Sequence, residues 1–203
     1  QMIVQTVAAP GRVVLAPEPG FVMYRQIAVV NGLDYQGVPL GQEFVLDSAA
    51  MLAAIRKYRP AVIFLAYPNN PTGNLFDTQQ IEAILAHAEG LVVVDEAYAP
   101  FTDASFLPQL QAHENLLVLR TLSKMGLAGL RLGLLAGAPA WLEQIDKTRL
   151  PYNISSLNQA SGCFALAHDA VFAKQARLIR ESRGALMDGL LKIPGLTVYP
   201  SEA

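Results

Sequence analysis

The sequence contains a single cysteine, Cys163, among 203 residues. One cysteine excludes an internal disulfide and a metal site built from several cysteines, and it is typical of a reducing compartment. Charge is sparse as well, since 15 Lys and Arg against 17 Asp and Glu give a formal net charge of -2 with no basic stripe. We therefore expect a cytoplasmic protein without a nucleic-acid partner.

Long hydrophobic runs are also missing, although 52% of the residues are hydrophobic. No apolar run approaches the ~20 residues that a membrane helix needs. The N-terminus lacks the basic and apolar regions of a signal peptide. The three histidines, His87, His113 and His168, do not have metal-ligand spacing. The sequence thus predicts a soluble globular protein with one substantial core, no membrane segment and no metal site.

Short apolar segments alternate with amphipathic ones. The four most apolar segments are "RVVLAP" (12–17), "AVIFLAY" (61–67), "LVVVDEAY" (91–98) and "LLVLRTLS" (116–123). Nearly continuous apolar character is typical of strands that are covered on both faces. Between them, residues 47–58 and 77–88 have apolar side chains at helical spacing, and each segment opens on an aspartate N-cap candidate, Asp47 or Asp77. This alternation predicts a doubly wound α/β fold with a mostly parallel sheet and helices on both faces.

The rest of the chain continues the pattern. "RLGLLAG" (131–137) is a further strand candidate, residues 138–149 are expected to form a helix begun near Pro139, and helical spacing continues with interruptions over 157–191. The first residues, "QMIVQTVAAPG", resemble the second half of a helix, and "LTVYPSEA" ends the chain at a strand-like run. Both ends suggest a piece of a longer protein.

Ligands of doubly wound sheets bind at the carboxyl ends of the strands, and polar or aromatic residues follow four of the predicted strands here. They are Phe21 and Tyr24, Asn69 and Asn70, Asp95 with Glu96 and Tyr98, and Lys124. Taken singly, each of these residues has an ordinary structural explanation. The asparagines could form a turn and the aspartate could cap a helix, while the aromatic residues could pack in the core and the lysine could lie in a surface loop. Together with an arginine, Arg131, they supply the amide, carboxylate, phenol and cations that a lysine-tethered pyridoxal phosphate site requires.

Three motifs carry a family resemblance. They are "PNNPTG" (68–73), "VVVDEAYAPF" (92–101) and "RTLSKMGLAGLRLG" (120–133). With them the chain resembles the fold type I pyridoxal phosphate-dependent aminotransferases over nearly its whole length. Within that group, "DEAYAPF", "RTLSK" with "GLAGLRLG", and "PYNISSLNQA" (151–160) are similar to the histidinol-phosphate aminotransferases.

The resemblance implies roles for five residues around the cofactor ring. Lys124 would hold the cofactor covalently and act as the general base. Asp95 would pair with the pyridinium nitrogen, while Asn70 and Tyr98 would hydrogen-bond the phenolate oxygen. Phe21 stands where the family carries an aromatic ring stacked on the cofactor face.

The resemblance further implies that Thr121, Ser123 and Arg131 bind the cofactor phosphate. The loop "KMGLAGLR" is one residue shorter than in some relatives. A phosphate-cupping loop, a tyrosine donated by a partner subunit and the arginine that binds the substrate carboxylate are not found in this sequence. We therefore expect residues 1–193 to form a cofactor-binding large domain that lacks its N-terminal part, and 194–203 to begin a small domain.

The reaction implied is transamination between a small-molecule amino donor and a 2-oxo acid. By resemblance, histidinol phosphate and 2-oxoglutarate would give imidazole acetol phosphate and glutamate in histidine biosynthesis. Three alternatives share the motifs: an aminotransferase for other amino acids, a lyase or decarboxylase of the same fold, and a non-catalytic pyridoxal phosphate-sensing domain of a regulator. The family also implies a homodimer, with the turn carrying Tyr24 and the helical residues after Tyr152 as candidate contacts.

Overall fold

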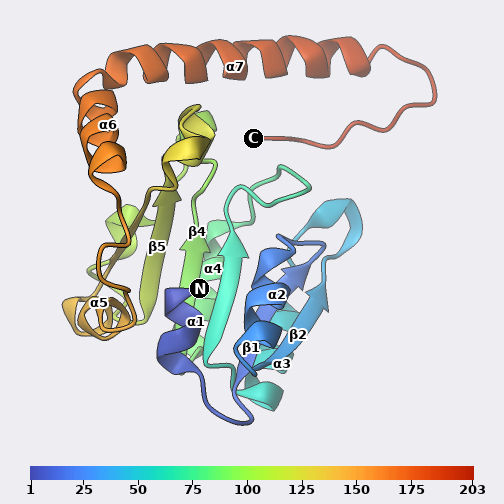
Figure 1. Cartoon of the computed structure of the whole chain (residues 1–203). Coiled ribbons are helices and arrows are strands. Elements are labelled where there is room, and N and C mark those ends of the chain that lie inside the picture. Colours follow the sequence, from blue (N-terminus) through green and yellow to red (C-terminus); the bar gives the residue numbers. More distant parts are fainter.

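A computed structural model describes residues 1–203, and its centre is a six-stranded sheet with strand order β2-β1-β3-β4-β5-β6 (Figure 1). The strands are β1 Val13–Glu18, β2 Asp34–Pro39, β3 Val62–Ala66, β4 Leu91–Asp95, β5 Leu116–Thr121 and β6 Gly133–Gly137. Strands β1 to β5 pair in parallel, and β6 pairs antiparallel with β5. The predicted mostly parallel sheet is confirmed, with β6 as its antiparallel member.

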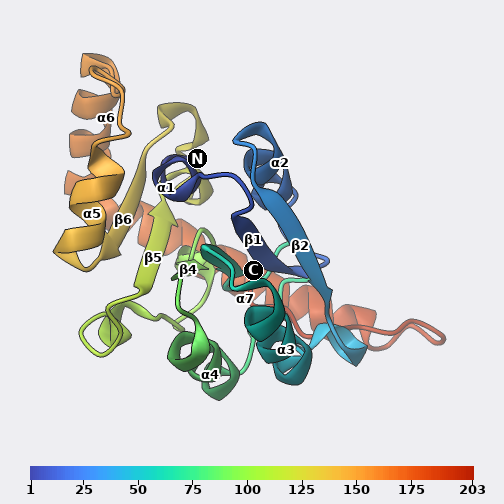
Figure 2. The ribbon, with the colours of Figure 1, turned by 90° about the horizontal axis from the view of Figure 1, so that it is seen from below.

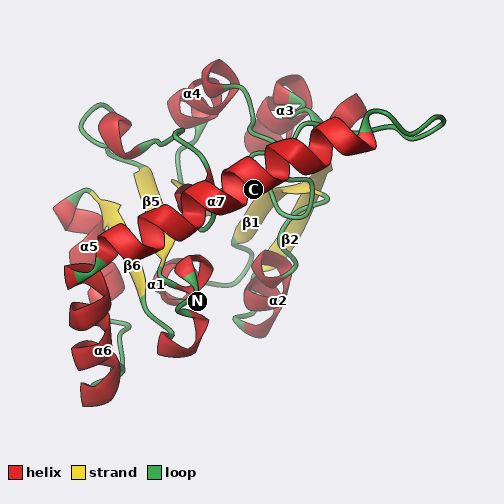
Figure 3. Ribbon diagram, turned by 90° about the horizontal axis from the view of Figure 1, so that it is seen from above, coloured by secondary structure: helices red, strands yellow, loops and turns green.

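Helices cover both faces of this sheet, as the doubly wound prediction requires (Figure 2). They are α1 Met2–Val7, α2 Met23–Val30, α3 Ser48–Tyr58, α4 Thr78–His87, α5 Pro139–Asp146, α6 Ser156–Ala167 and α7 Asp169–Leu190. Helices α3 and α4 pack on one face, and α1, α2 and α5 pack on the other. Helix α7 runs across the carboxyl edge of the strands instead of along a face (Figures 1 and 3). None of the helices combines the length and the apolar character needed to cross a membrane.

The core consists of two apolar layers, one on each side of the sheet. Val92 and Val94 of β4 pack with α3 and α4, while Leu91 and Val93 of the same strand pack with the layer of α1, α2 and α5. Successive side chains of a strand point to opposite faces, so an all-apolar strand serves both layers. The four side chains are fully buried, and each contributes roughly 1.5–3 kcal/mol by burial. The same alternation sends Asp95 and Glu96 to opposite sides at the end of β4.

The predicted helix caps are confirmed. The carboxylate of Asp47 accepts a hydrogen bond from the Ala50 backbone N–H at 2.9 Å, and that of Asp77 accepts one from the Gln79 N–H at 2.7 Å. Each such cap is worth about 1 kcal/mol. They fix where α3 and α4 begin, and thereby the lengths of the loops that follow β2 and β3.

Three features differ from the expectations or were not expected. Strand β2 and helix α2 were not predicted, because "DYQGVP" is a polar edge strand with Gly and Pro, and α2 has no side-chain N-cap. The strand expected near Leu196 is absent, and residues 194–203 run without secondary structure back to the sheet edge. Tyr24, expected at an outer surface, is only 6% exposed because its ring packs from α2 onto Phe64 of β3.

Candidate active site

The order of the strands in the sheet changes direction at β1. β2 follows β1 on one side, and β3 returns to its other side, so the β1 and β3 carboxyl ends flank the switch point where such sheets bind ligands. The loop after β1 carries Phe21, and the loop after β3 carries Asn70. The next two strands bring Asp95 and Lys124 to the same edge.

Lys124 lies in a single 3-10 turn, Ser123–Met125, directly after β5. Gly126 ends this turn with φ of +89°, a conformation that favours glycine, and so turns the chain back toward β6. The Lys124 Nζ lies over the ring of Tyr98, 5.0 Å from its centroid, at cation-π distance. The Tyr98 hydroxyl accepts a hydrogen bond from Asn70 Nδ2 at 3.2 Å. Tyr98 thus contacts two other predicted residues, Lys124 and Asn70, and the three come from three different loops.

A small cavity of about 50 Å³ connects these side chains with Asp95 and Phe21. Its lining comprises Phe21, Tyr24, Ala66, Asn70, Asp95, Ala97, Tyr98 and Lys124. The structure therefore brings together all five residues predicted around the cofactor ring. Ala66 and Ala97 contribute small side chains to this lining, beside the aromatic rings of Phe21, Tyr24 and Tyr98.

Asp95 is the acid of this cavity and is only 8% exposed. Its Oδ2 accepts a hydrogen bond from the Tyr24 hydroxyl at 2.7 Å, and its Oδ1 accepts one from the Ala97 N–H at 3.1 Å. Burial raises the pKa of Asp95, and the two hydrogen bonds and the charge of Lys124 oppose that rise. The carboxylate is therefore held by neutral donors and a nearby cation, without a direct ion pair.

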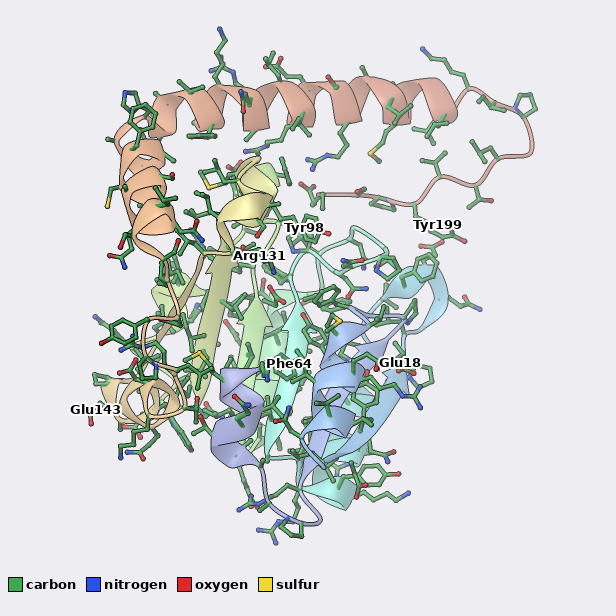
Figure 4. All side chains as sticks on the ribbon, in the orientation of Figure 1. Glu18, Phe64, Tyr98, Arg131, Glu143 and Tyr199 are labelled. Carbon is green, nitrogen blue, oxygen red and sulfur yellow. The ribbon has the colours of Figure 1, made fainter.

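Thr121 ends β5, Ser123 and Arg131 lie in the loop between β5 and β6, and none of the three lines this cavity. The Thr121 and Ser123 hydroxyls are 2.9 Å apart, and the Ser123 N–H donates to Thr121 Oγ1 at 3.0 Å, so they shape the loop around Lys124. Arg131 is exposed, and its Nη1 donates to the Ala128 carbonyl at 3.2 Å. Figure 4 shows Arg131 and Tyr98 at the same end of the sheet, with Phe64 deeper in it. The phosphate-binding role of these three residues stays a prediction.

Two contributors to the site were missed from the sequence. Tyr24 was noted after β1 but given no place beside Asp95; its spacing of three residues from Phe21, which puts both rings on one side of a helical turn, was the available signal. Asn69, an ordinary turn residue by its sequence, is 2% exposed and donates to the Pro19 carbonyl at 3.1 Å and to Thr72 Oγ1 at 2.7 Å. It joins the loop of Phe21 to the loop of Asn70.

On the opposite side of β4, Glu96 is fully buried. Its carboxylate accepts hydrogen bonds from Arg120 Nε at 2.9 Å, Ser105 Oγ at 3.1 Å and the Phe106 N–H at 2.6 Å. Arg120 also forms an ion pair with it at 2.8 Å. This network closes the loop that contains Tyr98 against β5.

Helix α7 is tied to the edge of the site by Arg183. Its Nη1 donates to the Phe101 carbonyl at 3.1 Å, three residues after Tyr98, and its Nη2 pairs with Glu202 at 3.2 Å. The Glu202 N–H in turn donates to the Gly73 carbonyl at 2.7 Å, at the end of the loop that carries Asn70. The chain after α7 therefore links the two loops whose side chains meet at the Asn70–Tyr98 hydrogen bond.

The fold and these motifs place the chain in a known family: residues 1–203 match the model of aminotransferase class I and II, and the chain belongs to that family. It is 56% identical over 203 residues to histidinol-phosphate aminotransferase 2 of Nitrosococcus oceani and 52% identical over 207 residues to the enzyme of that name from Cupriavidus pinatubonensis. All of the chain is covered in both cases, against 56% and 57% of the relatives, so the chain spans little more than half of their length.

Solved structures show the same fold. The histidinol-phosphate aminotransferase of Sinorhizobium meliloti in complex with pyridoxal-5'-phosphate superposes with a TM-score of 0.88 at 26% identity, covering all of this chain and 56% of that one. A putative histidinol-phosphate aminotransferase from Erwinia carotovora gives a TM-score of 0.88 at 25% identity over the whole chain and 61% of its own. The fold type I aminotransferase fold that the motifs imply is confirmed.

The donor set at the cavity fits pyridoxal phosphate. An amine, a buried carboxylate, an amide, a phenol and an aromatic ring correspond to the formyl carbon, ring nitrogen, phenolate oxygen and face of that cofactor. The hydroxyls of Thr121 and Ser123 lie just before Lys124, at the end of β5 and in the turn after it, where a phosphate attached to the same ring would need donors. No cluster of three or more His, Cys, Asp or Glu side chains could hold a metal ion.

Proposed function

We propose that the protein is a pyridoxal phosphate-dependent aminotransferase that converts histidinol phosphate and 2-oxoglutarate to imidazole acetol phosphate and glutamate. The observation that carries the proposal is the convergence of Lys124, Asp95, Asn70, Tyr98 and Phe21 on one cavity at the carboxyl edge of the sheet. The identity to histidinol-phosphate aminotransferases, 56% and 52%, supports this choice of donor.

When bound, the cofactor supplies a protonated pyridine ring that accepts electrons from the carbon beside the substrate amine. The Lys124 amine would hold the cofactor at its formyl group. Once the substrate amine has replaced it there, Lys124 Nζ would be free to act as the general base that moves the substrate proton. Its position over the Tyr98 ring keeps the amine beside the cavity.

The other residues bind and orient. Asp95 keeps the ring nitrogen protonated, because a buried carboxylate stabilises a cation placed beside it. Asn70 and Tyr98, already hydrogen-bonded to each other, donate to the ring oxygen, and Phe21 covers one ring face. Thr121, Ser123 and Arg131 bind the phosphate, the arginine after it leaves the Ala128 carbonyl.

The proposal also covers the domains, the oligomeric state and the cellular location of the protein. Residues 1–193 form the cofactor-binding domain and 194–203 lead into a second domain that supplies the clamp for the substrate carboxylate. The protein works as a homodimer in the cytoplasm. Exposed apolar side chains on α6, among them Leu157 and Phe164, are candidates for the subunit contact.

The test is the absorbance spectrum of the purified protein with pyridoxal phosphate, before and after borohydride reduction. We expect a band near the visible edge that reduction fixes covalently on Lys124, located by peptide mass spectrometry. Lys124→Ala abolishes the fixed adduct, while Lys192→Ala, which removes an exposed lysine far along the chain, leaves it unchanged. An adduct that persists in Lys124→Ala would contradict the assignment.

The donor is tested by incubating the protein with histidinol phosphate, aromatic amino acids or threonine phosphate, each with and without 2-oxoglutarate. We expect glutamate to form fastest from histidinol phosphate, and none to form without the 2-oxo acid. Carbon dioxide or phosphate release without 2-oxoglutarate would instead indicate a lyase or decarboxylase. An adduct without any product would indicate the sensing domain.

A further inference from the structure

The side chain of Tyr24 is immobilised beside the candidate site. Its ring stacks on Phe64 with centroids 4.5 Å apart and planes 10° apart, and it forms a T-shaped pair with Phe21, with centroids 5.4 Å apart and planes 86° apart. It is 6% exposed. The hydroxyl is therefore fixed by aromatic packing on both sides, and its one side-chain partner is Asp95 Oδ2, at 2.7 Å.

This hydroxyl determines the orientation of the carboxylate. The terminal torsion of an aspartate is broad and roughly two-fold, so a carboxylate with one partner is free to turn. Here Ala97 N–H holds Oδ1 at 3.1 Å and the Tyr24 hydroxyl holds Oδ2, and the two fixed donors define its plane. Each ionised oxygen keeps a lone pair for a further donor.

The hydroxyl also acts on the charge of Asp95. Burial raises the pKa of Asp95, and hydrogen bonds from Tyr24 and Ala97, with the Lys124 charge, lower it. The pKa of Tyr24 itself is raised well above its usual value by burial and by the Asp95 charge, so the phenol keeps its proton and remains a donor. Tyr35, Tyr98 and Glu96 are the other titratable groups nearby, and none of them donates to Asp95.

We propose that Tyr24 is a positioning residue that orients Asp95 and keeps it ionised for the ring nitrogen of the cofactor. The inference rests on the proposed pyridoxal phosphate function and adds a residue that acts through Asp95 without touching substrate. The packing of Tyr24 against Phe64 needs only a ring, whereas the hydrogen bond needs the hydroxyl. Tyr24→Phe therefore separates a structural role from a positioning role.

The experiment compares wild type and Tyr24→Phe loaded with pyridoxal phosphate that carries ¹⁵N in its ring, and follows the ¹⁵N signal as the pH is varied. We expect the ring nitrogen of Tyr24→Phe to lose its proton at lower pH than in wild type. The dissociation constant of the cofactor should rise about tenfold, since hydrogen bonds to charged groups are the strong ones. Tyr67→Phe, which removes the hydroxyl of another buried tyrosine packed against Phe106, should behave as wild type.

A double-mutant cycle establishes whether Tyr24 acts through Asp95. In an Asp95→Asn background, removing the Tyr24 hydroxyl should no longer change cofactor affinity or the ring titration. An equal loss in both backgrounds, or an unchanged ¹⁵N titration in Tyr24→Phe, would overturn the inference while the reducible Lys124 adduct still supports the proposed function.

Two further controls keep the outcomes distinct. If wild type itself forms no reducible adduct, the proposed function fails and this inference with it. If Tyr24→Phe does not fold, Tyr24→His replaces it, because imidazole keeps a planar ring and an N–H donor. A folded Tyr24→His that titrates like wild type supports the inference, and one that binds cofactor without restoring the ring titration overturns it.

Discussion

Asp95 and Glu96 are neighbours in the chain, and both carboxylates are buried, yet they stand in contrasting surroundings on the two sides of β4. Glu96 has an arginine, a hydroxyl and a backbone N–H on its oxygens. Asp95 has a phenol and a backbone N–H, with Lys124 nearby but no ion pair. A buried carboxylate that has a complete set of partners, such as Glu96, stabilises the fold. A buried carboxylate without a paired cation, such as Asp95, can bind a ligand that carries a positive charge.

The largest expected effect on stability comes from removing Glu96, the acid whose hydrogen-bond partners are complete. Glu96→Ala removes the acceptor for three donors and leaves Arg120 without its ion-pair partner. The free energy of unfolding should therefore fall by about 3 kcal/mol, less than for a fully buried pair because the Arg120 side chain is 35% exposed. Urea denaturation measures this. The control is Glu181→Ala, whose pair with Arg177 is exposed on both sides and should matter by under about 0.5 kcal/mol. A Glu96→Ala loss as small as the control would contradict the structural role.

The next prediction concerns Asp95→Asn, which should increase the stability of the protein where Glu96→Ala decreases it. Burial raises the pKa of Asp95 above its ordinary 3.8, so the cofactor-free folded state binds more protons than the unfolded state between 3.8 and the raised value. Its stability therefore falls as pH rises through that window. Asp95→Asn removes this penalty and should be more stable than wild type at pH 7, with the advantage disappearing below pH 3.8. Transamination should nevertheless fall about 100-fold, because a preorganised charge is lost.

Denaturation of the two proteins at pH 3 and pH 7 and a rate assay at pH 7 check both halves of this prediction. Glu96→Gln is the matched variant on the other side of the strand and should lose stability at pH 7. If Asp95→Asn and Glu96→Gln shift stability in the same direction, the contrast between the two acids is wrong.

Only part of the contrast between Asp95 and Glu96 could be predicted from the sequence. Strand alternation in "LVVVDE" places the two acids on opposite sides of β4, and the motifs predicted Lys124, Asn70 and Tyr98 as site residues. Nothing in the local pattern showed that the partner of Glu96 would be Arg120, 24 residues away, or that Tyr24 would reach Asp95 across 71 residues. Such pairings arise from strand order, which local periodicity does not encode. The polar edge strand β2 was missed for the same reason, since its neighbour β1 supplies its stability.

The smallest expected effect tests whether the carboxyl edge is stiffened from outside the cavity. Arg183 joins the Phe101 carbonyl to Glu202, and its side chain is 18% exposed, so Arg183→Ala should reduce the free energy of unfolding by about 1 kcal/mol. It should also weaken cofactor binding a few-fold, because the loops of Asn70 and Tyr98 lose their common support.

Arg180→Ala is the matched control on the same helix. Its partner Asp103 is exposed and has its pKa lowered by the Arg180 hydrogen bond, a contribution lost as pH falls below 3.8. Arg180→Ala should thus alter acid stability but leave cofactor affinity unchanged. Equal affinities for both variants would show that helix α7 merely covers the site.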